Sequence, residues 1–259
     1  MTPWITCLLA GAMTLLLAAA ASAEAMDEKQ KSDYVVLLHG MGRTSLSMKR
    51  MEHYLANHGY RVINVTYHSR RLSIEQLSED YLRNLLAQKI TDPGAKVHFV
   101  THSLGGIILR QYLANHAPEN LGRVVMLAPP NHGSEIIDCL QAHPISREFI
   151  GASGRELGTG ADAVPNRLGP VHFECGVIAG DRSFNPFLTA LLPRPNDGKV
   201  SVASAKVEGM SDCLVLHSTH TWLMWRERAL RQTLRFLESG HFDHANRNRY
   251  TAVRELNIL

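Results

Sequence analysis

From Asp33 onward the sequence alternates short apolar runs with longer segments in which apolar residues recur at helical spacing. A continuous apolar run is typical of a strand that is covered on both faces. Its alternation with amphipathic helices predicts parallel βαβ units with right-handed crossovers. We therefore predict an α/β fold with a doubly wound, mostly parallel sheet and helices on both faces. Strands are expected at residues 34–38, 61–67, 96–101, 123–127, 173–179 and 213–216.

The helices between these strands show start and stop signals. A helix around Met48 to Leu55 is expected to end at Gly59. Ser73 and Gln76 form a capping-box pattern ahead of a second amphipathic helix. Further helices are expected at residues 104–115 and 221–237, and the polar tail from residue 241 is expected to be loosely ordered.

A chain of 259 residues is long enough for one substantial core, and we predict a single domain over residues 24–259. The net charge of +3, with its basic residues scattered, excludes nucleic acid as the main partner. The regular rhythm breaks between Pro129 and Pro170. Since long insertions in compact domains are usually functional or mobile, residues 131–170 are predicted to form a cap.

Residues 1–23 differ from the rest of the chain. An apolar run from Ile5 to Ala20 precedes the small-residue site Ala21-Ser22-Ala23, as in a secretory signal peptide. The protein is therefore expected to be exported, to the periplasm or the medium. The first four residues contain no Lys or Arg, so an uncleaved membrane anchor is the alternative.

Removal of this segment leaves Cys139, Cys175 and Cys213, an odd number in a compartment where disulfides form. The sequence leaves two alternatives open. Either two of these residues form a disulfide and the third is a free thiol, or all three are buried thiols.

Residues 99–106, Phe-Val-Thr-His-Ser-Leu-Gly-Gly, lie where a predicted strand turns sharply into a helix. They match a nucleophile elbow centred on Ser103, except that Thr101 replaces the usual first glycine. Small residues are needed here because strand and helix approach closely, and Gly105 and Gly106 meet this need. Ser103 is therefore the candidate nucleophile, although a serine at such a place is often only a helix N-cap.

A serine nucleophile needs donors for the negative charge that develops on the carbonyl oxygen of the substrate. The backbone N–H of Leu104 follows the nucleophile directly. The second donor is expected from the turn His39-Gly40-Met41-Gly42 after the first strand, and we nominate the Met41 N–H.

The general base should follow the acid in sequence and precede the last helix. His220 lies in the loop before that helix, whereas His217 still belongs to the strand, so we prefer His220. His217, like His39, His102 and His132, is expected to be structural or to line the site. For the acid, Asp181 directly follows a strand and Asp197 lies in an Asn-Asp-Gly turn; position alone favours Asp181.

These motifs resemble the bacterial lipase and esterase branch of the α/β hydrolases, over about Asp33 to Gly240. The resemblance rests on the His-Gly-Met-Gly turn, the elbow, the segment 128–134 (Ala-Pro-Pro-Asn-His-Gly-Ser) and the Asn-Asp-Gly turn. In such lipases that turn supplies the acid, and a histidine about two dozen positions later supplies the base. His220 lies 23 positions after Asp197. The resemblance therefore favours Asp197 over Asp181.

The resulting prediction is hydrolysis of carboxylic esters by Ser103, His220 and Asp197 through an acyl-enzyme, with Met41 and Leu104 binding the oxyanion. The substrate is expected to be a small-molecule or lipid ester, with peripheral lipid contact through the cap. No cofactor is implied, and the histidines lack the spacing of a zinc site. The alternatives are acyl transfer or amide cleavage by the same residues, and a non-catalytic envelope protein on a hydrolase scaffold.

Overall fold

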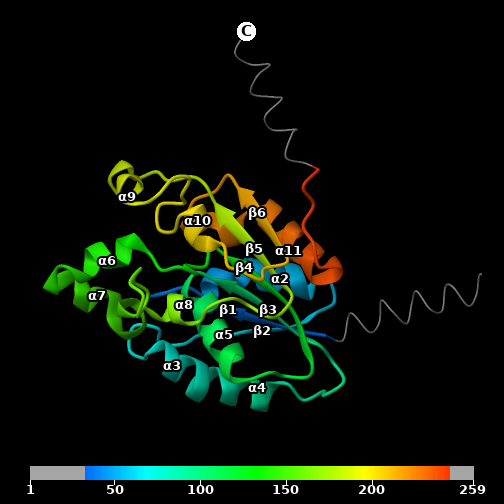
Figure 1. The fold of residues 1–259 in the computed structure, drawn as a ribbon. Coiled ribbons are helices and arrows are strands. Elements are labelled where there is room, and N and C mark those ends of the chain that lie inside the picture. The colour runs from blue at the N-terminus through cyan, green and yellow to red at the C-terminus, as the bar shows by residue number, and fades with distance from the viewer. Residues whose placement is uncertain (1–32, 246–259) are drawn as a thin grey trace, which may run out of the picture.

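The computed structural model describes residues 33–245 and contains one sheet of six strands (Figure 1). The strand order is β2-β1-β3-β4-β5-β6, and every neighbouring pair is parallel. All six predicted strands are present, although β2 ends before Tyr67. Their bounds are β1 Tyr34–Leu38, β2 Arg61–Asn64, β3 Val97–His102, β4 Leu121–Leu127, β5 Cys175–Gly180 and β6 Asp212–Leu216.

Helices cover both faces of the sheet, as predicted for a doubly wound fold. Side chains along β1 alternate between the two cores, with Val35 and Leu37 on one face and Val36 and Leu38 on the other. The first face is covered by α2 (Lys49–Ala56), the 3₁₀ helix η3 (His220–Trp225) and α11 (Glu227–Ser239). The second is covered by α3 (Ile74–Gln76), the π-helical turn η2 (Leu77–Leu82), α4 (Arg83–Lys89), α5 (Leu104–Asn115) and α10 (Val202–Ala205).

Local signals read from the sequence account for several helix ends. The predicted capping box is present, because the Ser73 side chain accepts from the Gln76 N–H and the Gln76 side chain accepts from the Ser73 N–H. Gly59 follows α2 with φ of 90°, a conformation that ends a helix readily only at glycine. Within residues 33–245 no helix is both long and apolar enough to cross a membrane. The predicted signal peptide, residues 1–23, lies outside the described residues.

The insertion between β4 and β5 contains three helices that its sequence did not predict: α6 (Glu135–Gln141), α7 (Pro144–Arg155) and α8 (Val164–Arg167). Helix α7 is kinked at Gly151, which has φ of 70°. A Cβ atom there would lie 2.3 Å from the carbonyl oxygen of Arg70, and the next residue, Ala152, donates its N–H to that same oxygen. The kink thus seats the insertion on the loop that follows β2.

A buried arginine in α5 joins the two ends of the insertion. The Arg110 guanidinium donates to the backbone and side-chain oxygens of Asn131, both at 3.1 Å, and to the carbonyl oxygen of Gly169 at 2.5 Å. Asn131 is itself fully buried and donates its side-chain N–H to Ala205. Since buried polar groups must be paired, Arg110 and Asn131 are expected to contribute strongly to the stability of this region.

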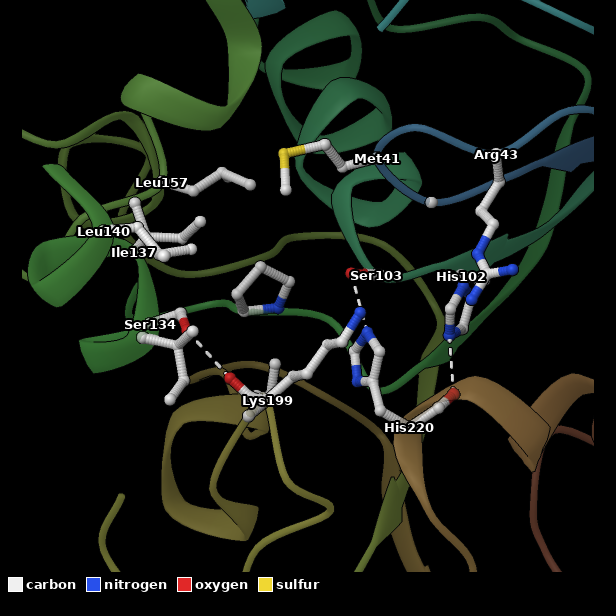
Figure 2. A pocket seen from close by; sticks show the side chains of 14 residues that line it. Met41, Arg43, His102, Ser103, Ser134, Ile137, Leu140, Leu157, Lys199 and His220 are labelled. Atoms are coloured by element: carbon white, nitrogen blue, oxygen red, sulfur yellow. Dashed lines mark hydrogen bonds between the residues drawn. The ribbon is translucent and has the colours of Figure 1, made fainter. Parts of the chain in front are cut away.

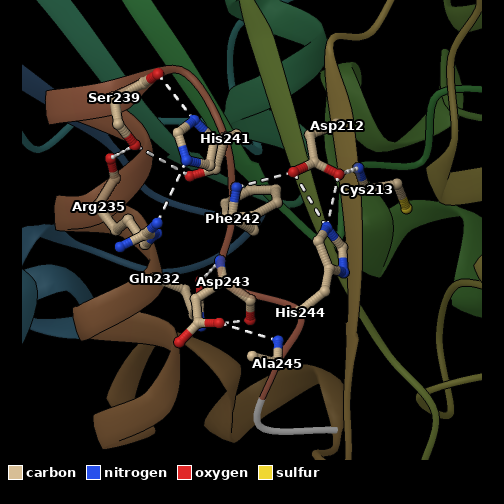
Figure 3. Close-up of polar contacts among 10 residues, drawn as sticks. All are labelled: Asp212, Cys213, Gln232, Arg235, Ser239, His241, Phe242, Asp243, His244 and Ala245. Atoms are coloured by element: carbon tan, nitrogen blue, oxygen red, sulfur yellow. Dashed lines mark hydrogen bonds and ion pairs between the residues drawn. The ribbon is translucent and has the colours of Figure 1, made fainter.

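The first residues of the C-terminal tail are ordered against β6 and α11 (Figure 3). Asp212 accepts the N–H of Phe242 and pairs with the His244 ring, and the Gln232 side chain exchanges two hydrogen bonds with the backbone of Asp243. Phe242 is 2% exposed. The expectation of a loosely ordered tail is therefore wrong for residues 241–245, because Phe242 anchors them in the core; residues 246–259 lie outside the described range.

Among the described residues no disulfide joins the three cysteines. Cys175 is buried in β5, where burial raises the pKa of its thiol to about 12. Cys139 is exposed on α6. Neither alternative drawn from the sequence matches fully, because there is no disulfide pair and the thiols are not all buried.

Replacement of Arg110 by Met should lower the free energy of unfolding by about 3 kcal/mol, because the two oxygens of buried Asn131 and the Gly169 carbonyl would lose their donor. Urea denaturation followed by circular dichroism measures this change. The control is Arg83→Met, at an exposed position of α4, which should change stability by no more than about 0.5 kcal/mol. Equal losses in the two variants would contradict the role assigned to Arg110.

Candidate active site

The turn from β3 into α5 places Ser103 at the carboxyl edge of the sheet. Ser103 has φ of 54°, a conformation that costs a residue with a side chain about 1–3 kcal/mol. Its N–H donates to Leu127 of the neighbouring strand. Gly105 permits the close approach of strand and helix, because a Cβ atom there would lie 2.6 Å from the Leu38 carbonyl oxygen. The predicted elbow geometry is therefore present.

The unusual Thr101 is accommodated by Gly106. Thr101 is fully buried, and its hydroxyl oxygen lies 3.3 Å from where a Cβ atom of residue 106 would be. The hydroxyl has no hydrogen-bond partner among the described residues. The threonine side chain thus occupies space that a side chain at position 106 would otherwise need.

A continuous hydrogen-bond chain links Ser103, His220 and Asp197. The Ser103 hydroxyl lies 3.0 Å from His220 Nε2, and His220 Nδ1 lies 2.8 Å from Asp197 Oδ2. The side chains of His220 and Asp197 are 6% and 1% exposed. With Asp197 accepting at Nδ1–H, His220 Nε2 is left as an acceptor facing the serine hydroxyl, which is the tautomer that a general base requires.

The Asn-Asp-Gly turn fixes Asp197. Its second carboxylate oxygen, Oδ1, accepts the backbone N–H groups of Lys199 and Val200 at 3.0 and 2.8 Å. Its backbone oxygen accepts the His220 N–H at 3.1 Å. Gly198 has φ of 91°, which the turn needs and which glycine adopts without strain.

The alternative acid and base are paired with each other instead. His217 Nδ1 lies 2.9 Å from Asp181 Oδ1, and Arg182 contacts His217 Nε2 at 2.9 Å. The His217 side chain is 59% exposed. Neither His217 nor Asp181 lines the pocket that contains Ser103.

The turn after β1 lies against Ser103. A Cβ atom on Gly40 would be 3.2 Å from Ser103 Cβ, so a side chain at this position would crowd the serine. The N–H of Gly42 donates to the Ser69 hydroxyl. Met41, nominated as an oxyanion donor, lies between these two glycines and lines the pocket, and Leu104 is the first residue of α5.

His39 supports this turn from beneath. Its Nδ1 donates to the Gly40 carbonyl at 2.8 Å, and its Nε2 accepts the Tyr67 N–H at 3.2 Å. Its ring stacks on the Tyr67 ring with centroids 3.8 Å apart. Burial lowers the pKa of His39, so its imidazole is neutral near pH 7. The prediction of a structural imidazole is correct for His39.

His102 lines the pocket beside His220. Its Nε2 donates to the His220 carbonyl oxygen at 3.1 Å, and its Nδ1 has no partner among the described residues. Burial, and to a lesser degree the neighbouring His220, lower the pKa of His102 well below its usual value. By contrast His132 is exposed and does not line the pocket, so the expectation for that residue is wrong.

Ser103 and His220 face a cavity of about 110 Å³ (Figure 2). The insertion contributes much of its wall through Ser134, Ile136, Ile137, Leu140 and Leu157. In the described part of the chain no three His, Cys, Asp or Glu side chains are grouped to hold a metal ion. The arrangement places a serine hydroxyl, hydrogen-bonded to an imidazole, beside a largely apolar recess.

Sequence reasoning did not find Arg43 and Lys199, which also line this cavity. Both lie in loops without periodic pattern. The sequence signal that could have identified them is their position beside the motifs. Arg43 follows the His-Gly-Met-Gly turn, and Lys199 follows the Asn-Asp-Gly turn.

Comparison with known protein families assigns the chain to one of them. The model of the alpha/beta hydrolase family matches residues 35–252. The chain belongs to that family. Among curated proteins none matches the chain.

Solved structures of other alpha/beta proteins share the fold. The mature lipase BlEst2 of Bacillus licheniformis has a TM-score of 0.62 at 18% identity, covering 80% of this chain and 91% of its own. The metagenomic carboxyl esterase MGS0156 has a TM-score of 0.56 at 19% identity, with coverages of 74% and 65%. Phospholipase PlaB of Legionella pneumophila has a TM-score of 0.51 at 19% identity, with coverages of 68% and 45%. At these identities the likeness shows the fold alone.

The two acidic candidates in this alpha/beta hydrolase give opposite expectations. Asp197→Asn should slow the reaction of Ser103 with a fluorophosphonate by about 10³-fold or more, because His220 loses the acceptor that fixes its tautomer. The rate of covalent labelling, measured by mass spectrometry, reports this effect. Asp181→Asn is the matched control and should label at nearly the wild-type rate; the opposite ranking would transfer the acid to Asp181.

Proposed function

We propose that the protein hydrolyses carboxylic esters through an acyl-enzyme formed on Ser103. The observation that carries this proposal is the hydrogen-bond chain from Asp197 through His220 to Ser103, which opens onto the apolar cavity. Family membership supports a hydrolase. The fold shared with a lipase, a carboxyl esterase and a phospholipase supports an ester as the substrate.

In the first step the Ser103 oxygen bonds to the ester carbonyl carbon while its proton passes to His220 Nε2. The carboxylate of Asp197, held at Nδ1–H, stabilises the imidazolium that forms. When the carbonyl re-forms, the bond to the alcohol oxygen breaks, and His220 returns its proton to that oxygen. A water molecule then repeats the sequence, which releases the acid and regenerates Ser103.

The negative charge on the carbonyl oxygen is stabilised by the N–H groups of Met41 and Leu104 in this proposal. Leu104 begins α5, and the first N–H groups of a helix have no partner within it. The positive end of the α5 dipole also favours an anion there. Gly42 is excluded as a donor because its N–H is occupied by Ser69.

The insertion determines which acyl chains fit. Ile136 and Ile137 are 9% and 5% exposed and line the cavity, whereas Ile145 and Phe149 of α7 are 77% and 68% exposed. We assign the first pair to the acyl site. The second pair is our candidate for contact with a lipid surface, since exposed apolar side chains next to a pocket favour such contact. Export of the enzyme remains a prediction from residues 1–23.

The proposed role of Ser103 as nucleophile is tested by removing its hydroxyl group. A fluorophosphonate probe should label wild-type Ser103 and leave Ser103→Ala unlabelled, and hydrolysis of p-nitrophenyl butyrate should fall by about 10³-fold or more in that variant. Peptide mapping of the labelled protein identifies the residue. A wild-type protein that reacts with neither the probe nor the ester would be a non-catalytic scaffold.

The acyl site is tested by narrowing it. Leu140→Trp places a larger side chain on the cavity wall, so kcat/KM for p-nitrophenyl octanoate should fall at least about ten-fold relative to p-nitrophenyl acetate. Glu148→Trp, at an exposed position of α7 in the same insertion that does not line the cavity, should leave this ratio unchanged. A uniform loss for both esters in Leu140→Trp would argue that the insertion does not contact the acyl chain.

A further inference from the structure

Two positively charged side chains line the cavity that contains Ser103 and His220. Arg43 comes from the turn after β1 and Lys199 from the loop that precedes α10. In Figure 2 the Lys199 side chain extends in the direction of Ser103 and His220. The proposed chemistry uses neither cation.

No carboxylate of the described residues lies within 4.0 Å of either cation, although ion pairs of this kind occur elsewhere in the fold. Asp197 is the carboxylate nearest to Lys199 in sequence, but its oxygens are occupied by backbone N–H groups and by His220. The two cations therefore carry charge that the described part of the protein does not neutralise.

The position of Lys199 is unfavourable for its charge. Desolvation is the largest influence and lowers the pKa of the ammonium, Arg43 lowers it further, and Asp197 raises it only in part. Lys199 and Arg43 are both exposed overall, so this desolvation concerns only the part of Lys199 that lines the cavity. A cation held in this way is stabilised when an anion binds beside it, because the ion pair offsets the lost hydration.

The cavity separates apolar from charged contacts. Ile137, Leu140 and Leu157 gather on the side of the insertion, and Arg43 lies on the opposite side of Ser103 (Figure 2). The Ser134 hydroxyl donates to the Lys199 carbonyl oxygen at 2.8 Å, which fixes the loop that carries the cation. A neutral triglyceride or simple alkyl ester would use only the apolar side.

We propose that the substrate is an ester with an anionic group, a carboxylate or a phosphate, a few bonds from the scissile carbonyl, and that Lys199 and Arg43 bind this group. The inference rests on the proposed ester hydrolysis and specifies its substrate class. It differs from a general electrostatic effect on the oxyanion, which would favour charged and neutral esters alike.

The test compares anionic esters with neutral partners that have the same scissile ester. One pair is the mono-p-nitrophenyl ester of glutaric acid and its methyl ester, which place a carboxylate on the acyl side. The other is 1-butyrylglycerol 3-phosphate and monobutyrin, which place a phosphate on the alcohol side. The wild-type enzyme should prefer the anionic member of at least one pair by about ten-fold in kcat/KM at low ionic strength, and added salt should reduce the preference.

Lys199→Met and Arg43→Met, which alter two different loops, should each reduce this preference by at least about five-fold. Lys206→Met is the control, because it removes an exposed lysine seven positions from Lys199 that does not line the cavity. Circular dichroism verifies that each variant is folded. The ratio within a pair is the readout, since a purely structural role would change both members equally.

The outcomes separate this inference from the function on which it rests. Turnover of the neutral esters without an anionic preference in either pair would overturn the inference and leave ester hydrolysis intact. An unchanged ratio in both cavity variants would overturn it as well. Absence of turnover with all four esters, together with an unlabelled Ser103, would overturn both proposals.

Discussion

The left-handed backbone of Ser103 is the constraint on which the rest of the site depends. A side chain in this conformation is strained, and it persists only because β3 and α5 are both buried and held on either side of it. Glycine at positions 40 and 105 removes the atoms that would otherwise separate the turn, the strand and the helix. In this conformation the hydroxyl points away from the edge of the sheet, and the loops that follow the neighbouring strands surround it.

Backbone contacts, rather than side-chain packing alone, hold His220 in register with this hydroxyl. Its N–H is bonded to the Asp197 backbone and its carbonyl oxygen to the His102 ring, so the peptide groups on both sides of its Cα are fixed. His102 directly precedes Ser103 in sequence. The proposed nucleophile and the proposed base are therefore joined through adjacent residues of one turn as well as through their own hydrogen bond.

The sheet and the positions of Ser103 and His220 could be predicted from sequence, because each depends on local patterns: apolar runs for the strands, small residues for the elbow, and a loop before the last helix. Position in the sequence favoured Asp181, which directly follows β5, and only the resemblance to lipases favoured Asp197. The structure separates them only through the path of the intervening loop, which brings Asp197 back to His220 while Asp181 pairs with His217.

The helices of the insertion were not predicted because they too depend on tertiary contacts. Gly151 interrupts the helical period of α7, and the kink there is stabilised by contact with Arg70, a residue 81 positions earlier. The proposed role of Lys199 likewise depends on the residues that surround it in the cavity, and not on its neighbours in the sequence. Tertiary contacts of this kind leave no periodic trace in a single sequence.

Because Arg110 binds the polypeptide where the insertion leaves the sheet and where it returns, the two anchor points stay together whatever lies between them. Lengthening a loop whose ends are already held costs little, about 0.6 kcal/mol for each doubling. Evolution is thus free to exchange the residues between Asn131 and Gly169 without disturbing β4 or β5. A fold built in this way can acquire a new substrate range by changes in the insertion, while the proposed catalytic residues stay in place.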